Sequence, residues 1–223
     1  MRKLLCLMLV MLMAMPCAMA EDVPELHTLW DMPLDITIDE FEAFVEAETG
    51  TEMERSSFIV QNARHSPPFT LYDLPAKLTA FFDAKQPPAL EIMGFALNDA
   101  KGWGAGAIER QFGEFVRLAE VLSETYGEPS GGQLLRWRSL KPGEFESYYT
   151  ELPMGDGWLD FERAIEAVQQ TGMDGGINVE WNNLLLSLMV GAEYRCELIF
   201  SVSATMPEYV PAIPFEEEAA DAF

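Results

Sequence analysis

Few residues of this chain are of the types that carry out catalysis. The 223 residues include two histidines, His27 and His65, and three cysteines, of which Cys196 lies farthest along the chain. Both histidines stand in proline-neighboured segments, and no pattern places either of them beside Cys196 or a serine, as nucleophilic catalysis requires. We therefore interpret Cys196 as a small hydrophobe on a buried strand and identify no catalytic residue.

Patterns for metals and cofactors are equally weak. The chain contains no H-E-x-x-H, no paired C-x-x-C and no D-x-D-x-D-G loop, so we predict no metal site. Gly102, Gly104, Gly106 and Ala107 satisfy a G-x-G-x-x spacing before a helix, as in dinucleotide-binding proteins. The parallel strand expected to follow, with its acidic residue, is replaced by the end of that helix, so we predict no cofactor.

Acidic residues dominate the charge of the chain. Asp and Glu number 37 against 14 Lys and Arg, which gives a net charge of −23 at pH 7. Nucleic acid is an unsuitable partner, because binding phosphates requires a basic face. So many carboxylates can also pair by chance, which leaves open a hydrolase that acts on an extracellular glycan or peptide through a carboxylate pair.

Because basic residues are scarce, their placement is informative. Arg136 and Arg138 flank Trp137, which we assign to the core, and Arg195 and Glu197 alternate with apolar residues of another expected strand. We predict that Arg136, Arg138, Arg195 and Glu197 point outward and form an interaction face for an acidic partner. The alternative is that the arginines make ordinary cross-strand pairs with nearby glutamates.

The first residues have the pattern of a secretory signal peptide. Arg2 and Lys3 precede an apolar run, and Ala18, Met19 and Ala20 form an A-x-A cleavage site. The run is too short for a confident membrane span. We expect cleavage between Ala20 and Glu21, which makes the product secreted or periplasmic and leaves Cys196 without an intramolecular disulfide partner.

Periodicity predicts one long helix over residues 107–126. Apolar residues recur there at alternating spacings of four and three, and Gly127 and Pro129 end the pattern. A second helix should begin after Thr37, because Thr37 and Glu40 form a capping box, and should end at Gly50. A third is expected over 159–170.

Short alternating runs separated by turn residues predict strands. They are 57–61, 69–72, 77–83, 90–97, 133–140, 177–181, 184–190 and 194–202. Asn182 and Asn183 should make a two-residue hairpin turn. We expect loops at 98–106 and 141–157.

These segments predict an α+β fold, an antiparallel sheet with two or three helices packed on one face. The expected organisation is a signal peptide at 1–20, an extended lead-in at 21–36 docked by Trp30, a single domain at 37–203, and a mobile tail rich in proline and acid at 204–223.

The helix opened by T-I-D-E at 37–40, the helix closing in Y-G-E-P at 126–129 and the Trp181-Asn-Asn hairpin together resemble small secreted bacterial domains of the β-lactamase-inhibitor-like type. The resemblance covers 37–203 and implies helices on one face of an antiparallel sheet whose other face meets a partner. It assigns no functional residue. We therefore expect a non-enzymatic binding domain for a protein or envelope component, with the carboxylate-pair hydrolase and a purely structural envelope protein as the alternatives.

The signal-peptide interpretation makes a direct prediction. The exported product should begin at Glu21, because signal peptidase cuts after the A-x-A site. N-terminal sequencing of the protein from culture medium or periplasm checks this, and a lipid-modified Cys17 at the terminus would contradict it.

Overall fold

The computed structural model describes seven stretches of the chain. They are residues 26–55, 62–85, 87–102, 105–141, 144–151, 174–190 and 196–206. Within them, the side chains of 98–102, 105, 134–141, 144–151 and 174 are not described.

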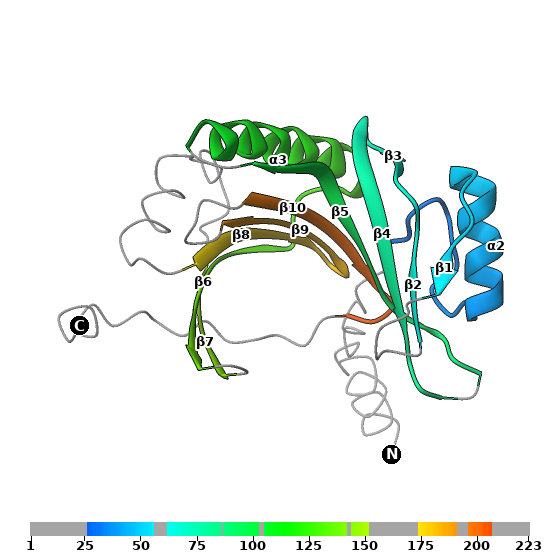
Figure 1. The fold of residues 1–223 in the computed structure, drawn as a ribbon. Helices are drawn as coiled ribbons and strands as arrows, with labels where there is room; N and C mark the ends of the chain where they lie inside the picture. Colours follow the sequence, from blue (N-terminus) through cyan, green and yellow to red (C-terminus); the bar gives the residue numbers. More distant parts are fainter. Residues whose placement is uncertain are drawn as a thin grey trace, which may run out of the picture.

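A single antiparallel sheet forms the body of the protein (Figure 1). Its ten strands are β1 (Glu54–Arg55), β2 (Ala63–His65), β3 (Phe69–Leu71), β4 (Leu74–Phe82), β5 (Leu90–Gly102), β6 (Gly131–Lys141), β7 (Glu144–Glu151), β8 (Asp174–Trp181), β9 (Leu184–Val190) and β10 (Cys196–Ser203). The order across the sheet is β1-β2-β4-β5-β10-β9-β8-β6-β7, and β3 pairs with β4. The predicted α+β class is confirmed.

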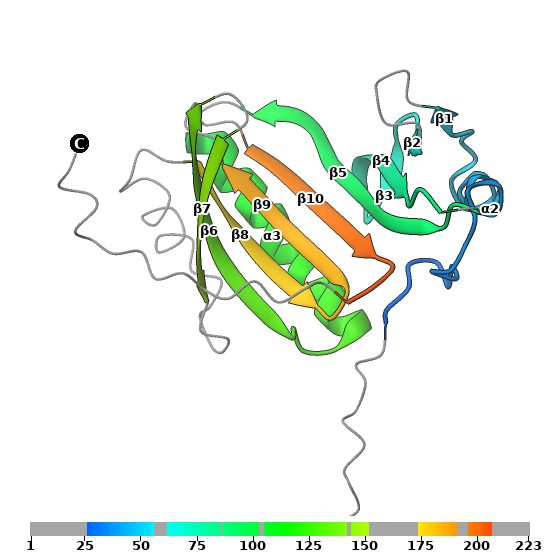
Figure 2. The same ribbon diagram turned by 90° about the horizontal axis from the view of Figure 1, so that it is seen from below.

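Helices α2 (Ile38–Thr49) and α3 (Ala105–Tyr126) cover the same face of this sheet. Helix α3 packs on β9 and β10, and α2 lies at the opposite end beside β1 and β2 (Figure 1). Phe41 of α2 meets Phe82 of β4 edge to face, with ring centroids 5.3 Å apart. We call the opposite side of the sheet the open face, because neither described helix lies on it; Figure 2 views the sheet from that side, with α3 behind β8 and β9.

Local capping residues set the helix limits. The backbone N–H of Thr37 donates to the Glu40 carboxylate at 3.0 Å, which completes the predicted capping box. Gly50 and Gly127 take positive φ values of 68° and 87° directly after α2 and α3. A residue with a Cβ is disfavoured in this left-handed conformation, so both predicted helix ends are confirmed for the reason expected.

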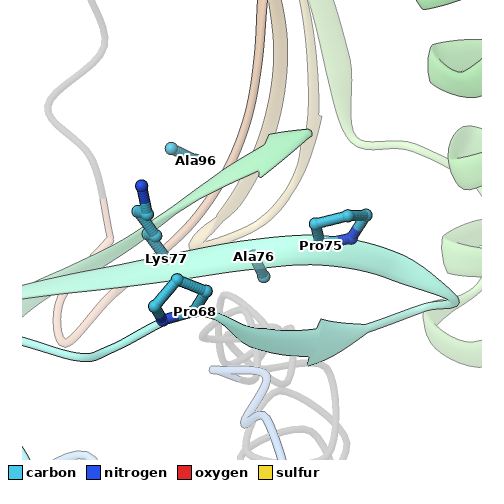
Figure 3. A pocket seen from close by; sticks show the side chains of 5 residues that line it. All are labelled: Pro68, Pro75, Ala76, Lys77 and Ala96. Carbon is cyan, nitrogen blue, oxygen red and sulfur yellow. The ribbon is translucent and has the colours of Figure 1, made fainter. Parts of the chain in front are cut away.

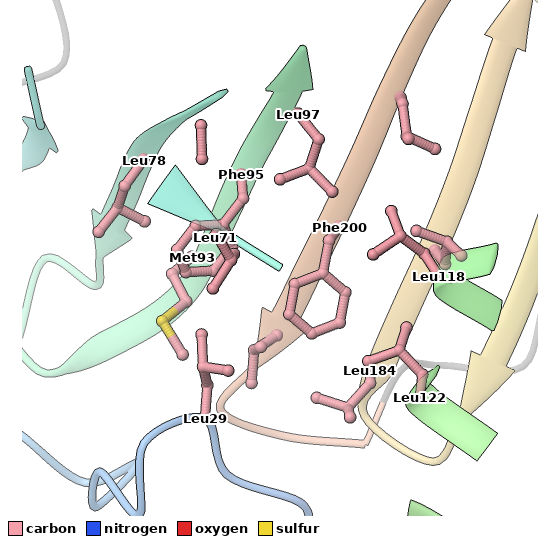
Figure 4. Close-up of a cluster of buried hydrophobic side chains, with 14 of the residues drawn as sticks. Leu29, Leu71, Leu78, Met93, Phe95, Leu97, Leu118, Leu122, Leu184 and Phe200 are labelled. Carbon is pink, nitrogen blue, oxygen red and sulfur yellow. The ribbon is translucent and has the colours of Figure 1, made fainter. Parts of the chain in front are cut away.

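The predicted stripe of α3 forms the centre of the core. Its members Ile108, Phe112, Phe115, Ala119 and Leu122 are at most 6 % exposed, and Tyr126 is half-buried. Figure 4 shows side chains of this helix directed at the sheet, where Phe200 stacks on Phe95 with centroids 5.7 Å apart. Two layers therefore share one continuous apolar interior.

The lead-in joins this core through its own side chains. Leu29 and Met32 are 4 % and 0 % exposed, and Trp30 packs edge to face on Phe95 at 5.9 Å between centroids. The backbone N–H of Leu90 donates to the carbonyl of Ile36 at 3.0 Å, which fastens the segment to the start of β5. Docking by Trp30 is confirmed.

Two predicted loops are wrong. Residues 98–102 are not a loop, because β5 continues to Gly102, which pairs with Cys196 after an irregularity in the ladder; α3 begins at Ala105, inside the other end of the predicted loop. The segment 141–157 contains β7, which pairs with β6 from Gln133↔Glu151 to Lys141↔Glu144. In both cases a neighbouring strand supplies backbone hydrogen bonds, which do not need an apolar alternation.

Strand β2 was not predicted, and prolines explain why it is short. Strands β2 and β3 pair with successive parts of β4, separated by Pro67 and Pro68, which cannot donate to a ladder. Between β2 and β3, the hydroxyl of Ser66 accepts a hydrogen bond from the backbone N–H of Leu78 at 2.9 Å, which keeps this segment attached to β4. A strand interrupted in this way lacks the alternation that would reveal it in the sequence.

Other predictions fall outside the described residues. They are the signal peptide at 1–20, the strand at 57–61, the helix at 159–170 and the tail beyond residue 206.

Burial of the helix stripe predicts a large effect at Phe115. Phe115→Ala should lower the free energy of unfolding by about 3 to 5 kcal/mol, because this side chain is fully buried and its removal leaves a cavity. Urea denaturation measures the loss. Glu120→Ala, exposed on the same helix, is the control and should change stability by less than about 0.5 kcal/mol. Equal effects of the two changes would contradict the packing of α3.

Candidate functional site

Regular alternation places half of the residues of each strand on the open face. Ser201 of β10, Leu185 of β9, Glu180 of β8 and Gly131 of β6 are successive cross-strand partners, so they form one row across four strands. Ser203, two residues further along β10 and therefore on the same face, pairs with Ile92 of β5. Directly paired residues point to the same side of a sheet, so these side chains share the open face.

A hollow of about 150 Å³ lies where these two rows meet the β8–β9 turn. It is lined by Ile92, Glu180, Asn182, Asn183, Leu184, Leu185, Ser201 and Ser203. An apolar cavity of about 150 Å³ can hold a molecule the size of benzene, so the hollow can accept a small group.

Glu180 is the only ionisable residue in this described lining, and it is half-buried. Burial raises the pKa of its carboxyl group above the ordinary value of 4.5. Among the described residues no cation lies in ion-pair contact with it. Its cross-strand partner on β6 is Gly131. A Cβ at position 131 would lie 3.6 Å from Oε2 of Glu180, and because glycine has no Cβ, this position leaves the carboxylate uncovered.

The turn beside the hollow is held by Asn183, which is 3 % exposed. Its side-chain carbonyl accepts from the backbone N–H of His27 at 2.7 Å. Its amide nitrogen donates to the carbonyls of His27 at 3.0 Å and Ser203 at 2.7 Å. One side chain thereby joins the lead-in, the β8–β9 turn and the end of β10.

A second set of hydrogen bonds ties the same turn to the end of α3. The indole of Trp181, 1 % exposed as a core tryptophan should be, donates to the carbonyl of Gly127 at 3.0 Å. The hydroxyl of Ser130 donates to the Glu180 carbonyl at 3.1 Å and accepts from the Asn182 backbone N–H at 2.8 Å. The backbone that carries Glu180 is therefore firmly positioned.

Tyr126, with Tyr72 beside it, helps to hold the lead-in in place. The Tyr126 hydroxyl donates to the carbonyl of Thr28 at 3.1 Å, and the His27 ring packs on the Tyr126 ring with centroids 5.0 Å apart. Burial raises the pKa of both Tyr72 and Tyr126. Both hydroxyl groups stay protonated at neutral pH, which suits a structural role in holding the lead-in.

Cys196 lies in the core, as the sequence predicts. Cys196 is 2 % exposed, and burial, followed by the nearby charge of Glu197, raises the pKa of its thiol to about 12. His65 lies three strands away from β10, where its Nδ1 is 2.9 Å from the Thr79 hydroxyl oxygen. The interpretation of Cys196 as a small hydrophobe is confirmed.

The structure describes the predicted interaction residues only in part. Arg195 lies outside the described residues, and so do the side chains of Arg136 and Arg138. Glu197 is exposed on the open face. Arg136 lies in register with Gly175, Val190 and Cys196, whereas Glu197 lies in the neighbouring row with Met189 and Gly176. Arg136 and Glu197 therefore lie in different rows of the ladder, and the predicted interaction face stays a prediction.

Sequence reasoning missed Glu180 and Asn183 as site residues. The Asn182-Asn183 pair signalled the turn, and Asn182 does take a positive φ of 55°. The long-range contacts of Asn183 and the burial of Glu180 had no local signal, because they arise from residues far along the chain, such as His27 and Ser130.

The described residues form an α+β protein with one helix-covered face and one hollowed open face. Comparison with protein-family models, curated proteins and solved structures gives no match. Within the described part, no group of three or more His, Cys, Asp or Glu side chains could hold a metal ion. No helix of that part is long and apolar enough to cross a membrane.

The raised pKa of Glu180 predicts a pH-dependent gain in stability for Glu180→Gln. A carboxyl group whose pKa is higher in the folded state favours folding below its unfolded pKa, and this contribution is lost as the pH rises through the folded value. The Gln variant should therefore have a higher Tm than the wild type near pH 7, and the difference should vanish below about pH 4.5. Thermal denaturation across this range measures it, and Glu197→Gln, exposed on the same face, is the control. A lower Tm for Glu180→Gln at neutral pH would contradict this effect of burial.

Proposed function

We propose that this protein is a secreted or periplasmic binding domain without enzymatic activity, and that its open face contacts another protein or an envelope component. The signal-peptide pattern at residues 1–20 supports export. The open face supports binding, because the two described helices cover only the opposite side of the sheet.

One observation carries the proposal: the open face keeps apolar side chains in partial contact with solvent. Ile199 of β10 pairs with the exposed Ala96 of β5, and Ile92, Leu185 and Met189 on adjacent strands are only partly buried. Small polar groups, including the hydroxyl of Ser201, lie between them. A contiguous apolar area with interspersed polar groups is typical of protein interfaces.

The hydrolase alternative lacks comparable support. A carboxylate-pair mechanism places two carboxylates on either side of the bond that is cleaved. The described lining of the hollow contains one carboxylate, that of Glu180. A second dent of about 10 Å³, lined by Pro68, Pro75, Ala76, Lys77 and Ala96, is large enough for about one water molecule. Figure 3 shows Lys77 and Ala96 on the same side of β4 and β5, beside this dent.

Adding bulk and charge at the centre of the open face should abolish binding. Ala96→Arg places a long cation on an exposed position of β5, and Ala47→Arg makes the same change on the exposed surface of α2. Immobilised mature protein is incubated with envelope and supernatant fractions of the source cells, and the retained proteins are identified by mass spectrometry. We expect one partner to be retained by the wild type and Ala47→Arg and lost by Ala96→Arg, with unchanged Tm values. Equal retention by both variants, or none by the wild type, would contradict the proposal.

A further inference from the structure

The hollow beside the β8–β9 turn has the chemistry of a cation site. Its one charged group is the half-buried carboxylate of Glu180, which has no ion pair with any described residue. Removing a carboxylate from water without a counter-charge is unfavourable, so a cation that enters the hollow would recover interaction energy. The overall charge of −23 attracts such a cation and repels an anion.

The other lining residues match a primary ammonium group at the end of an alkyl chain. The hydroxyls of Ser201 and Ser203 lie on the same side as Glu180 and can accept hydrogen bonds. An ammonium group has three donors and no acceptor, so it suits a carboxylate with hydroxyls beside it. Ile92 and Leu185 supply apolar walls along which methylene groups can lie.

We propose that this hollow binds the side chain of a lysine presented by a protein partner, with the ammonium group on Glu180 and the methylene chain between Ile92 and Leu185. This inference rests on the proposed binding function and assigns the chemistry of the partner's central contact. The chain's own last segment is unsuited to this role, because residues 207–223 contain no lysine, arginine or histidine.

The test uses the mature chain and two small probes that differ only in the terminal ammonium group. Nα-acetyl-L-lysine N-methylamide carries the ammonium group, and the norleucine counterpart has an alkyl chain without it. Titrations are followed by NMR chemical shifts of the labelled protein. We expect saturable shifts at Glu180, Ser201 and Leu185 with the lysine probe, and binding at least about tenfold weaker with the norleucine probe, as for loss of a charge-assisted hydrogen bond.

Matched variants assign the effect to one carboxylate. Glu180→Gln should weaken binding of the lysine probe by about tenfold or more, whereas Glu197→Gln, which removes the same charge from the same face outside the hollow, should change it less than about twofold. Equal weakening by both variants, equal affinity for the two probes, no saturable binding, or a dimer of the chain occupying this face would each overturn the inference.

The lysine inference and the proposed binding function can be tested separately. If Ala96→Arg abolishes retention of the partner while Glu180→Gln leaves both retention and probe binding unchanged, the open face binds its partner without a lysine in the hollow. Loss of partner retention in Glu180→Gln, with a Tm no lower than that of the wild type, would support the inference.

Discussion

Burial of one sheet face beneath helix α3 is the interaction on which the rest of the structure depends. The helix places Phe115 and Leu118 at 0 % exposure against β9 and β10, where Phe200 is equally buried. Neither layer is stable alone, because the helix stripe and the sheet face would both expose apolar area to water. Cys196 is the only cysteine among the described residues and it is not bonded, so this part of the chain is held together by packing and hydrogen bonds without a disulfide.

The hollow is a consequence of how this packed unit ends. Asn183 satisfies three backbone groups of the lead-in and β10, and Trp181 reaches the end of α3. These bonds hold the β8–β9 turn against the core. Glu180, the last open-face residue of β8 before this turn, therefore lies in the lining of the hollow. Buried polar groups are normally paired, and among the described residues the exceptions are Oδ1 of Asn178 and Oε1 of Gln111.

The two faces of the sheet differ in their chemistry. The covered face is fully apolar around Phe95 and Phe200, whereas the open face combines partly exposed Ile199 and Leu185 with hydroxyls and Glu180. Such a mixture provides apolar area for affinity and a few polar groups for selectivity. This strongly acidic protein carries many carboxylates. The carboxylate of Glu180 differs from the solvated ones because it is partly removed from water, not because of its charge.

The sequence alone determined the features that depend on neighbouring residues. The helix ends follow from the capping pair Thr37 and Glu40 and from Gly50 and Gly127. The hairpin follows from Asn182 and Asn183. The buried side of β10 follows from the alternation of its apolar residues Cys196, Leu198, Phe200 and Val202. Only the tertiary structure decided the strand order, the presence of β2 and β7, the continuation of β5 to Gly102, and the positions of Glu180 and Asn183. Capping and periodicity act over a few residues and are visible in the sequence, whereas ladder hydrogen bonds and burial depend on partners far along the chain, whose proximity exists only after the sheet has closed around its core.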